Sequence, residues 1–72
     1  MKIPTEKDIQ LKIGQRILEL RSKNNISQSE LCYAIKIDIS TLSRLERGKL
    51  NVTLRTLYKI AKHFGIEVKD LF

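Results

Sequence analysis

Apolar residues recur along the first third of the chain with the spacing of one face of an α-helix. This face consists of Ile9, Ile13, Ile17 and Leu20, at positions i, i+4, i+8 and i+11. We expect a helix from near Thr5 or later to about Asn24, because the pair Asn24-Asn25 tolerates the left-handed backbone that ends helices. Gly14 lies inside this stretch and marks either a close helix contact or a later start near Leu11.

Three further helix starts share one signature, a capping residue flanked by apolar residues. Ser27 and Glu30 form a capping box, in which each side chain accepts a hydrogen bond from the other residue's backbone N–H. Asp38 and Thr53 occupy the same capping place ahead of later apolar runs. The pattern predicts helices at 28–35, 39–47 and 54–64, the last ended by Gly65, and a short fifth helix at about 67–71.

The connection between the second and third predicted helices consists only of Lys36 and Ile37. So short a link holds two helices at a steep angle, which is the helix-turn-helix arrangement. We therefore expect a compact, all-α bundle of five helices, in which the second and third form a helix-turn-helix. Its expected core consists of Ile17, Leu20, Leu31, Cys32, Ile35, Ile37, Leu42, Leu45, Leu54, Leu57, Ile60, Ala61 and Phe64.

Length and composition narrow the class of protein. The 72 residues, 42% of them hydrophobic, make one small folded domain. No apolar run is long enough to span a membrane, and the first residues lack the apolar stretch of a secretory signal. The single cysteine, Cys32, excludes an internal disulfide and fits a reducing cytoplasm. His63 is the only histidine, so we expect no Cys/His metal site and no cofactor.

Positive charge dominates the chain. There are 14 Lys and Arg residues against 8 Asp and Glu, for a formal net charge of +6. A basic surplus favours an anionic partner, either nucleic acid or an acidic membrane surface. The membrane surface is disfavoured because no basic amphipathic helix carries Trp or Phe on its apolar face.

Three motifs carry a resemblance to a known family. They are Ser-Gln-x-Glu-Leu at 27–31, Ser-Thr-x-Ser-x-x-Glu-Arg-Gly at 40–48 and Leu-x-x-Ile-Ala-x-x-Phe-Gly-Ile at 57–66. Together with the closing Asp70-Leu71-Phe72, they make the chain from about Ile13 onward resemble the Cro/lambda-repressor-type helix-turn-helix family, also called the xenobiotic-response-element (XRE) family. We therefore expect a DNA-binding domain at 11–72, after an N-terminal arm or an extension of the first helix at 1–10. Lys2 and Lys7 would let such an arm reach a DNA minor groove.

The chain departs from the family's pattern at three positions. Lys36 stands where the family usually has Gly in the turn, Val52 where it often has Pro, and Cys32 where it usually has Ala. A positive φ at Lys36 would cost about 1–2 kcal/mol of backbone strain. Cys32 is expected to pack in the core as a small apolar residue.

The resemblance implies that the third helix lies in the DNA major groove with its first residues at the base edges. The matching base-contact positions are Ile39, Ser40, Ser43 and Arg44. Arg44 can pair bidentately with guanine O6 and N7, and its alternatives are a phosphate contact or a solvated charge. Ile39 fits a thymine methyl group and equally fits packing against the N-terminal segment.

The resemblance also implies contacts outside the bases. Phosphate contacts are expected from Gln28, Lys36, Thr41, Arg47, Lys49 and Asn51. Gln28 has the alternative of a solvated residue in the first turn of its helix. Arg21 and Glu46 match family positions that form a structural ion pair joining the first helix to the third.

These observations favour a sequence-specific transcriptional regulator that binds double-stranded DNA as a homodimer. Its operator would be pseudo-palindromic, with half-sites roughly 34 Å apart. The expected dimer interface consists of Ile66, Val68, Leu71 and Phe72, which alternatively close the core of the protomer. Such a domain resembles stand-alone phage or plasmid repressors, restriction–modification controllers and small antitoxins. The competing hypothesis is a protein-interaction module, such as an antitoxin that covers a toxin. The possible protein partners are therefore a toxin or RNA polymerase. No spacing suggests a catalytic relay, so an enzyme is not expected.

Overall fold

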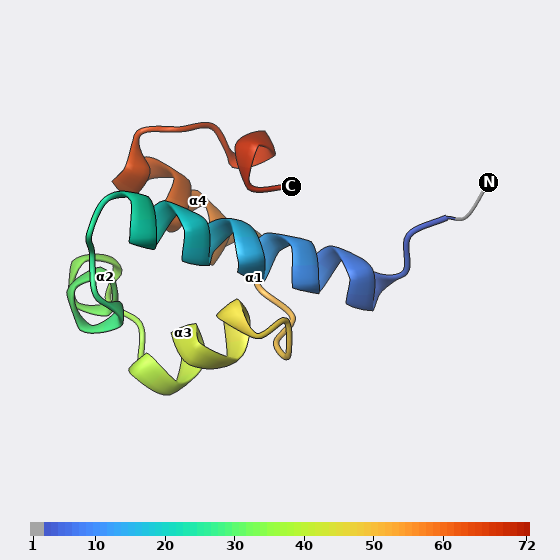
Figure 1. Cartoon of the computed structure of the whole chain (residues 1–72), viewed down its shortest axis with the longest axis horizontal. Helices are drawn as coiled ribbons and strands as arrows, with labels where there is room; N and C mark the ends of the chain where they lie inside the picture. Colours follow the sequence, from blue (N-terminus) through green and yellow to red (C-terminus); the bar gives the residue numbers. More distant parts are fainter. Residues whose placement is uncertain (1–2) are drawn as a thin grey trace.

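The computed structural model describes residues 3–72, which form four α-helices and one short 3-10 helix. The elements are α1 (Glu6–Lys23), α2 (Gln28–Ile35), α3 (Ile39–Glu46), α4 (Leu54–Phe64) and η1 (Val68–Leu71). α1 runs through the centre of the molecule, with α3 on one side and α4 and the C-terminal segment on the other (Figure 1). α2 lies at the end where α1 finishes. Lys2 falls outside the described residues, and Lys7 belongs to α1.

Side-chain caps begin the first two helices. The Thr5 hydroxyl accepts from the Asp8 N–H at 3.1 Å, and the Asp8 carboxylate accepts from the Thr5 N–H at 3.0 Å. The hydrogen bond from the Thr5 backbone is the larger of two that lower the pKa of Asp8 below its ordinary value. Ser27 and Glu30 form the same reciprocal pair at 3.0 and 3.1 Å, which confirms the predicted capping box. α1 therefore begins at the earlier of its two predicted starts.

The later elements differ in detail from the sequence prediction. Asp38 occupies the N-cap position of α3, but its exposed side chain makes no capping hydrogen bond, so that part of the prediction is wrong. The Thr53 hydroxyl does cap α4, accepting from the Thr56 N–H at 3.2 Å. α3 ends at Glu46 because the chain turns away through Gly48, whose φ is 71°. The last predicted helix is a 3-10 helix at 68–71, with Glu67 as its N-cap.

The hydrophobic core fills the space between α1 and the other elements. Its buried members are Ile13, Ile17, Leu20, Leu31, Cys32, Ile35, Leu42, Leu45, Leu57, Ile60, Ala61 and Leu71. Ile37 and Phe64, also predicted here, are half-buried against it. Burial raises the pKa of the Cys32 thiol, so this cysteine is an inert apolar residue of the core. Within residues 3–72, no helix combines the length and the apolar character that a membrane crossing needs.

Leu54 is the one predicted core residue that lies outside. Its side chain is 72% exposed, although its spacing from Leu57 fits the apolar face of α4. Leu54 is the first residue of that helix and lies on the wall of an open groove, without a neighbouring helix over it. Helical periodicity predicts which face an apolar residue occupies but not whether another element reaches that end of the helix.

Gly14 marks a close contact between α1 and the end of α3. A Cβ atom at Gly14 would lie 2.5 Å from the carbonyl oxygen of Leu45 and 2.7 Å from that of Glu46. Both oxygens belong to backbone, so a larger residue would push the two helices apart. Gly14 therefore marks a close helix contact and not a later start of α1 near Leu11.

The turn between α2 and α3 uses a left-handed residue that is not glycine. Lys36 has φ 58° and ψ 55°, and its N–H donates to the carbonyl oxygen of Cys32. The Ile37 N–H donates to the same oxygen at 3.1 Å. These bonds end α2 and aim the chain into α3. The strain anticipated at Lys36 is therefore present, because an L-residue is held in the left-handed region.

Candidate nucleic-acid interface

The outer face of α3 presents the residues that were expected at the base edges. Ser40 and Arg44 are exposed, Ile39 is 49% exposed and Ser43 is half-buried. All four fall within one side of the helix at 3.6 residues per turn. The opposite side is anchored by Leu42 and Leu45, which are buried. α3 therefore shows a continuous polar surface, with one apolar residue, toward solvent.

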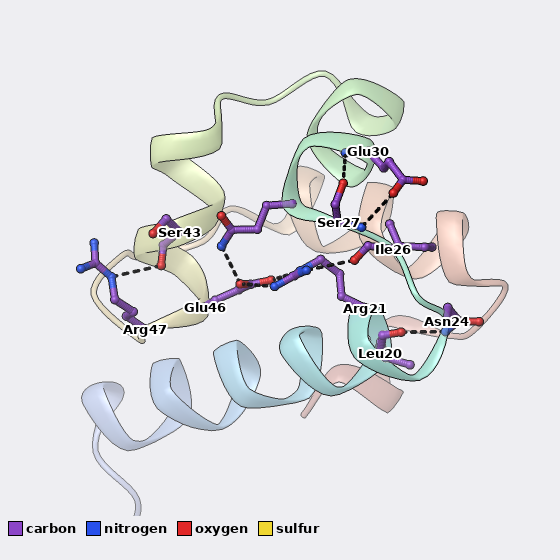
Figure 2. A network of polar contacts seen from close by, with 10 residues as sticks. Leu20, Arg21, Asn24, Ile26, Ser27, Glu30, Ser43, Glu46 and Arg47 are labelled. Carbon is purple, nitrogen blue, oxygen red and sulfur yellow. Dashed lines mark hydrogen bonds and ion pairs between the residues drawn. The ribbon is translucent and has the colours of Figure 1, made fainter.

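An ion pair holds the C-terminal end of α3 against α1. The Nε atom of Arg21 lies 2.6 Å from Oε2 of Glu46, and its Nη2 donates to Oε1 at 3.0 Å. Figure 2 shows the two side chains meeting between the helices. The side chains are only 14% and 6% exposed, so little water screens their attraction. The hydrogen bonds to Glu46 raise the pKa of Arg21 above its ordinary value.

The pair extends into a network that also holds α2. The Nη1 atom of Arg21 donates to the carbonyl oxygen of Ile26 at 2.9 Å. The Nε2 amide of Gln28 donates to Oε1 of Glu46 at 2.9 Å. Arg21, Glu46 and Gln28 thus tie three helices together at a single carboxylate. Because the partners come from α1, α2 and α3, the orientation of α3 is fixed relative to the rest of the domain.

Sequence reasoning missed the contact between Gln28 and Glu46. The half-buried side chain of Gln28, a predicted phosphate contact, donates to the carboxylate of Glu46. The second amide hydrogen and the amide oxygen remain available to another partner. Local pattern carries no signal for a contact between residues 18 positions apart. The sequence offered one indirect signal for this contact, because Glu46 was already expected to form an ion pair at the same end of α3.

A cleft of about 600 Å³ lies where the start of α1 faces the loop after α3. Lys7 from α1 and Arg47 and Lys49 from the loop line this cleft. The Arg47 Nε atom donates to the carbonyl oxygen of Ser43 at 3.3 Å, which holds the guanidinium beside α3. Three cations from two segments therefore gather next to the C-terminal end of α3, and with Glu6 as the one acidic residue of the lining the cleft keeps a positive balance.

The other predicted phosphate contacts are dispersed. The Asn51 side-chain oxygen accepts a hydrogen bond from the amide of Gln10, which lines this cleft, while Asn51 itself lines a neighbouring groove. Thr41 is half-buried on α3. Lys36 is separated from this group, because it lines a different groove between α2 and α4 that contains no residue of α3.

The predicted dimer residues differ widely in how much of each is exposed to solvent. Leu71 is fully buried, so it belongs to the core of the protomer and its assignment to a dimer interface is corrected. Ile66 and Val68 are half-buried against that core. Phe72 is 53% exposed and borders a groove of about 310 Å³ together with Ile9 and Leu54. One exposed apolar surface therefore lies where the start of α4 meets α1 and the C-terminus.

Comparison with known proteins assigns the fold. Residues 17–71 match the Helix-turn-helix family HTH_3. Control protein C.BamHI of Bacillus amyloliquefaciens is 38% identical over 65 residues, covering 89% of this chain and 80% of that protein. The crystal structure of the restriction-modification controller protein C.AhdI from Aeromonas hydrophila has a TM-score of 0.83 at 38% identity, covering 88% of this chain and 96% of that one.

A further structural relative shows the same fold in a complex. The restriction-modification controller protein C.Esp1396I was crystallised as a tetramer with its natural 35-base-pair operator. Its TM-score is 0.74 at 22% identity, and the match covers 88% of this chain and 93% of that one. The expected all-α, lambda-repressor-like fold is thereby confirmed, with a 3-10 turn as the last element. The chain belongs to the Helix-turn-helix (HTH_3; Cro/C1-type, XRE) family of DNA-binding transcriptional regulators, which is not a family of enzymes.

Proposed function

We propose that this protein regulates transcription by binding a pseudo-palindromic operator as a homodimer, with α3 of each copy in the major groove. The observation that carries the proposal is the way α3 is held. Its inner side is buried through Leu42 and Leu45, and the network around Glu46 fixes its end. A helix fixed in this way presents its outer face without reordering on binding, which lowers the entropic cost of specific contact.

Base readout is assigned to the outer face of α3. Arg44 is exposed at one edge of that face, where its guanidinium can form two hydrogen bonds to guanine O6 and N7. Ser40 and Ser43 add hydrogen bonds that suit several bases. Ile39 has half of its surface open, which suits a thymine methyl group.

Phosphate contacts are assigned around the C-terminal end of α3 and the start of α2. Arg47 and Lys49 supply charge beside the cleft, and Lys7 from α1 adds to it. Asn51, Thr41 and the free amide hydrogen of Gln28 supply neutral donors. These contacts set the register of α3 in the groove, and they carry the salt-dependent share of the binding free energy.

The homodimer is assigned to the exposed apolar surface formed by Ile9, Leu54 and Phe72. These side chains border one groove, and a second copy related by two-fold symmetry would cover them with the same patch. Ile66 and Val68, half-buried beside the C-terminus, would flank the contact. The tetramer that C.Esp1396I forms on its operator supports a multimeric state on DNA.

Fluorescence anisotropy tests the proposal. The purified protein is titrated against the duplex from directly upstream of its own gene and against a scrambled duplex, each over a range of salt concentrations. We expect the upstream duplex to bind about a thousandfold more tightly or better. Equal binding to both duplexes that disappears at high salt would reflect phosphate attraction alone and would contradict the proposal.

A further inference from the structure

A second groove, of about 480 Å³, lies between the last turn of α2 and the second half of α4. Ala34 and Ile35 contribute an apolar side, and Tyr58 lines it with an aromatic ring that is 56% exposed. Lys36, Lys59 and Lys62 complete the lining. No residue of α3 borders this groove, so it is separate from the surface assigned to base readout.

The groove is strongly and one-sidedly charged. Its lining includes three lysines and His63 but no Asp or Glu. Within residues 3–72 the ion pairs are Arg21–Glu46 and Glu67–Lys69, so none of these lysines is neutralised by one. The Lys62 ammonium lies 6.0 Å from the centre of the Tyr58 ring, at the outer limit of a cation–π contact.

Helix dipoles account for only part of this charge. Lys62 lies in the last turn of α4, where cations compensate the negative end of a helix. Lys59 lies a turn earlier, where that effect has faded. Lys36 is held in the left-handed region, where glycine would be less strained. A cation at this strained position faces the same groove as the lysines of α4, which suggests that the charge serves a ligand.

We propose that this groove binds an acidic segment of a protein partner, with an apolar or aromatic side chain anchored between α2 and α4. Charge complementarity selects the acidic side chains, and the Ala34, Ile35 and Tyr58 surface receives the anchor. A DNA duplex would supply negative charge, but it has no apolar side chain to bind the surface of Ala34, Ile35 and Tyr58. The proposal does not depend on operator binding, since the groove shares no lining residue with α3.

Synthetic peptides titrated into the ¹⁵N-labelled full chain test the proposal. The probe carries Glu and Asp around a Leu-Phe anchor. One control peptide has Lys in place of the acidic residues, and a second has Ser in place of the anchor. We expect saturable binding of the probe, with chemical-shift changes centred on Ala34, Ile35, Tyr58, Lys59 and Lys62. The lysine peptide should not bind, and the serine peptide should bind more weakly.

Two double variants distinguish binding in the groove from a general attraction of the acidic probe to a basic protein. Lys59→Gln/Lys62→Gln and Lys12→Gln/Lys23→Gln each lower the net charge of +6 by two, and Lys12 and Lys23 are exposed on α1. We expect the first pair of substitutions to weaken binding of the probe about five- to tenfold, because each ion pair near the surface contributes modestly. The second pair should weaken binding of the probe by less than about twofold. Circular dichroism verifies that all variants fold.

Three results would overturn the proposal. The first is shift changes centred on α3, and the second is equal weakening by both pairs of variants. The third is a scrambled DNA duplex that shifts the groove amides and displaces the probe, which would make the groove a nucleic-acid surface.

Discussion

The guanidinium of Arg21 in α1 contacts both carboxylate oxygens of Glu46 at the end of α3, at 2.6 and 3.0 Å. Gln28 of α2 donates to one of the same oxygens. One carboxylate therefore determines how three helices meet. Removing it would leave a nearly buried guanidinium without its partner, and α3 would lose its attachment at that end.

Glu46→Gln should lower the free energy of unfolding by about 2–3 kcal/mol, because breaking a mostly buried ion pair leaves the other charge uncompensated. Chemical denaturation followed by circular dichroism measures the change. Glu67→Gln is the matched control, since the ion pair of Glu67 with Lys69 is largely exposed and contributes under about 0.5 kcal/mol. Equal effects of the two substitutions would show that the network does not hold α3.

Gly14→Ala should destabilise the domain by about 1–3 kcal/mol, although alanine is the better helix former by about 1 kcal/mol. The added methyl group would press on the carbonyl oxygens of Leu45 and Glu46, which cannot rotate away. Gln15→Ala, at the neighbouring exposed position, should change stability by less than about 0.5 kcal/mol. If Gly14→Ala instead raised the free energy of unfolding, the close contact between α1 and α3 would not be needed for stability.

Lys36→Gly and Lys36→Asn should each stabilise the domain, by about 0.5–1 kcal/mol, because both residues tolerate the left-handed backbone found there. In a domain of this size the melting temperature should rise by several degrees. Lys36→Gln removes the charge and keeps the strain, so its melting temperature should stay near that of the parent protein. If all three variants melt alike, backbone strain at this turn is not a cost to stability.

Much of the fold was accessible from sequence because its determinants are local. The Ser27–Glu30 box lies within one helical turn, and the bounds of α2 and α4 follow from their caps and from Gly65. Asp38 shows the limit of that reasoning, since a capping residue type stands at the right place without making the bond. Leu54 shows another limit, because its exposure depends on where neighbouring elements end.

The candidate site was less accessible. The outward face of α3 follows from helical periodicity, and the resemblance to the family identified its polar residues. The attachment of Gln28 to Glu46 and the cleft that Lys7 shares with Lys49 depend on how α1, α2 and α3 pack together. Contacts of that kind join distant parts of the chain, so no local pattern predicts them. The burial of Leu71 within the protomer has the same origin.

Leu54→Gln should weaken the homodimer about tenfold or more, because it places an amide within the proposed apolar contact. Sedimentation velocity over a range of protein concentrations measures the dimer dissociation constant. Tyr33→Gln is the control, since Tyr33 is 89% exposed on α2 and outside that surface. A dimer that tolerates Leu54→Gln but not Tyr33→Gln would move the interface to α2.

Base readout by α3 is tested by measuring how Arg44→Ala and Lys49→Ala change the affinity for the upstream and scrambled duplexes. If Arg44 reads a base, Arg44→Ala weakens binding to the upstream duplex by about 1–3 kcal/mol and leaves binding to the scrambled duplex much less affected. Lys49→Ala should weaken both duplexes alike and reduce the salt dependence by about one counterion. If Arg44→Ala instead weakens binding to both duplexes equally, Arg44 does not read a base, and α3 is not the helix that gives sequence specificity through this residue.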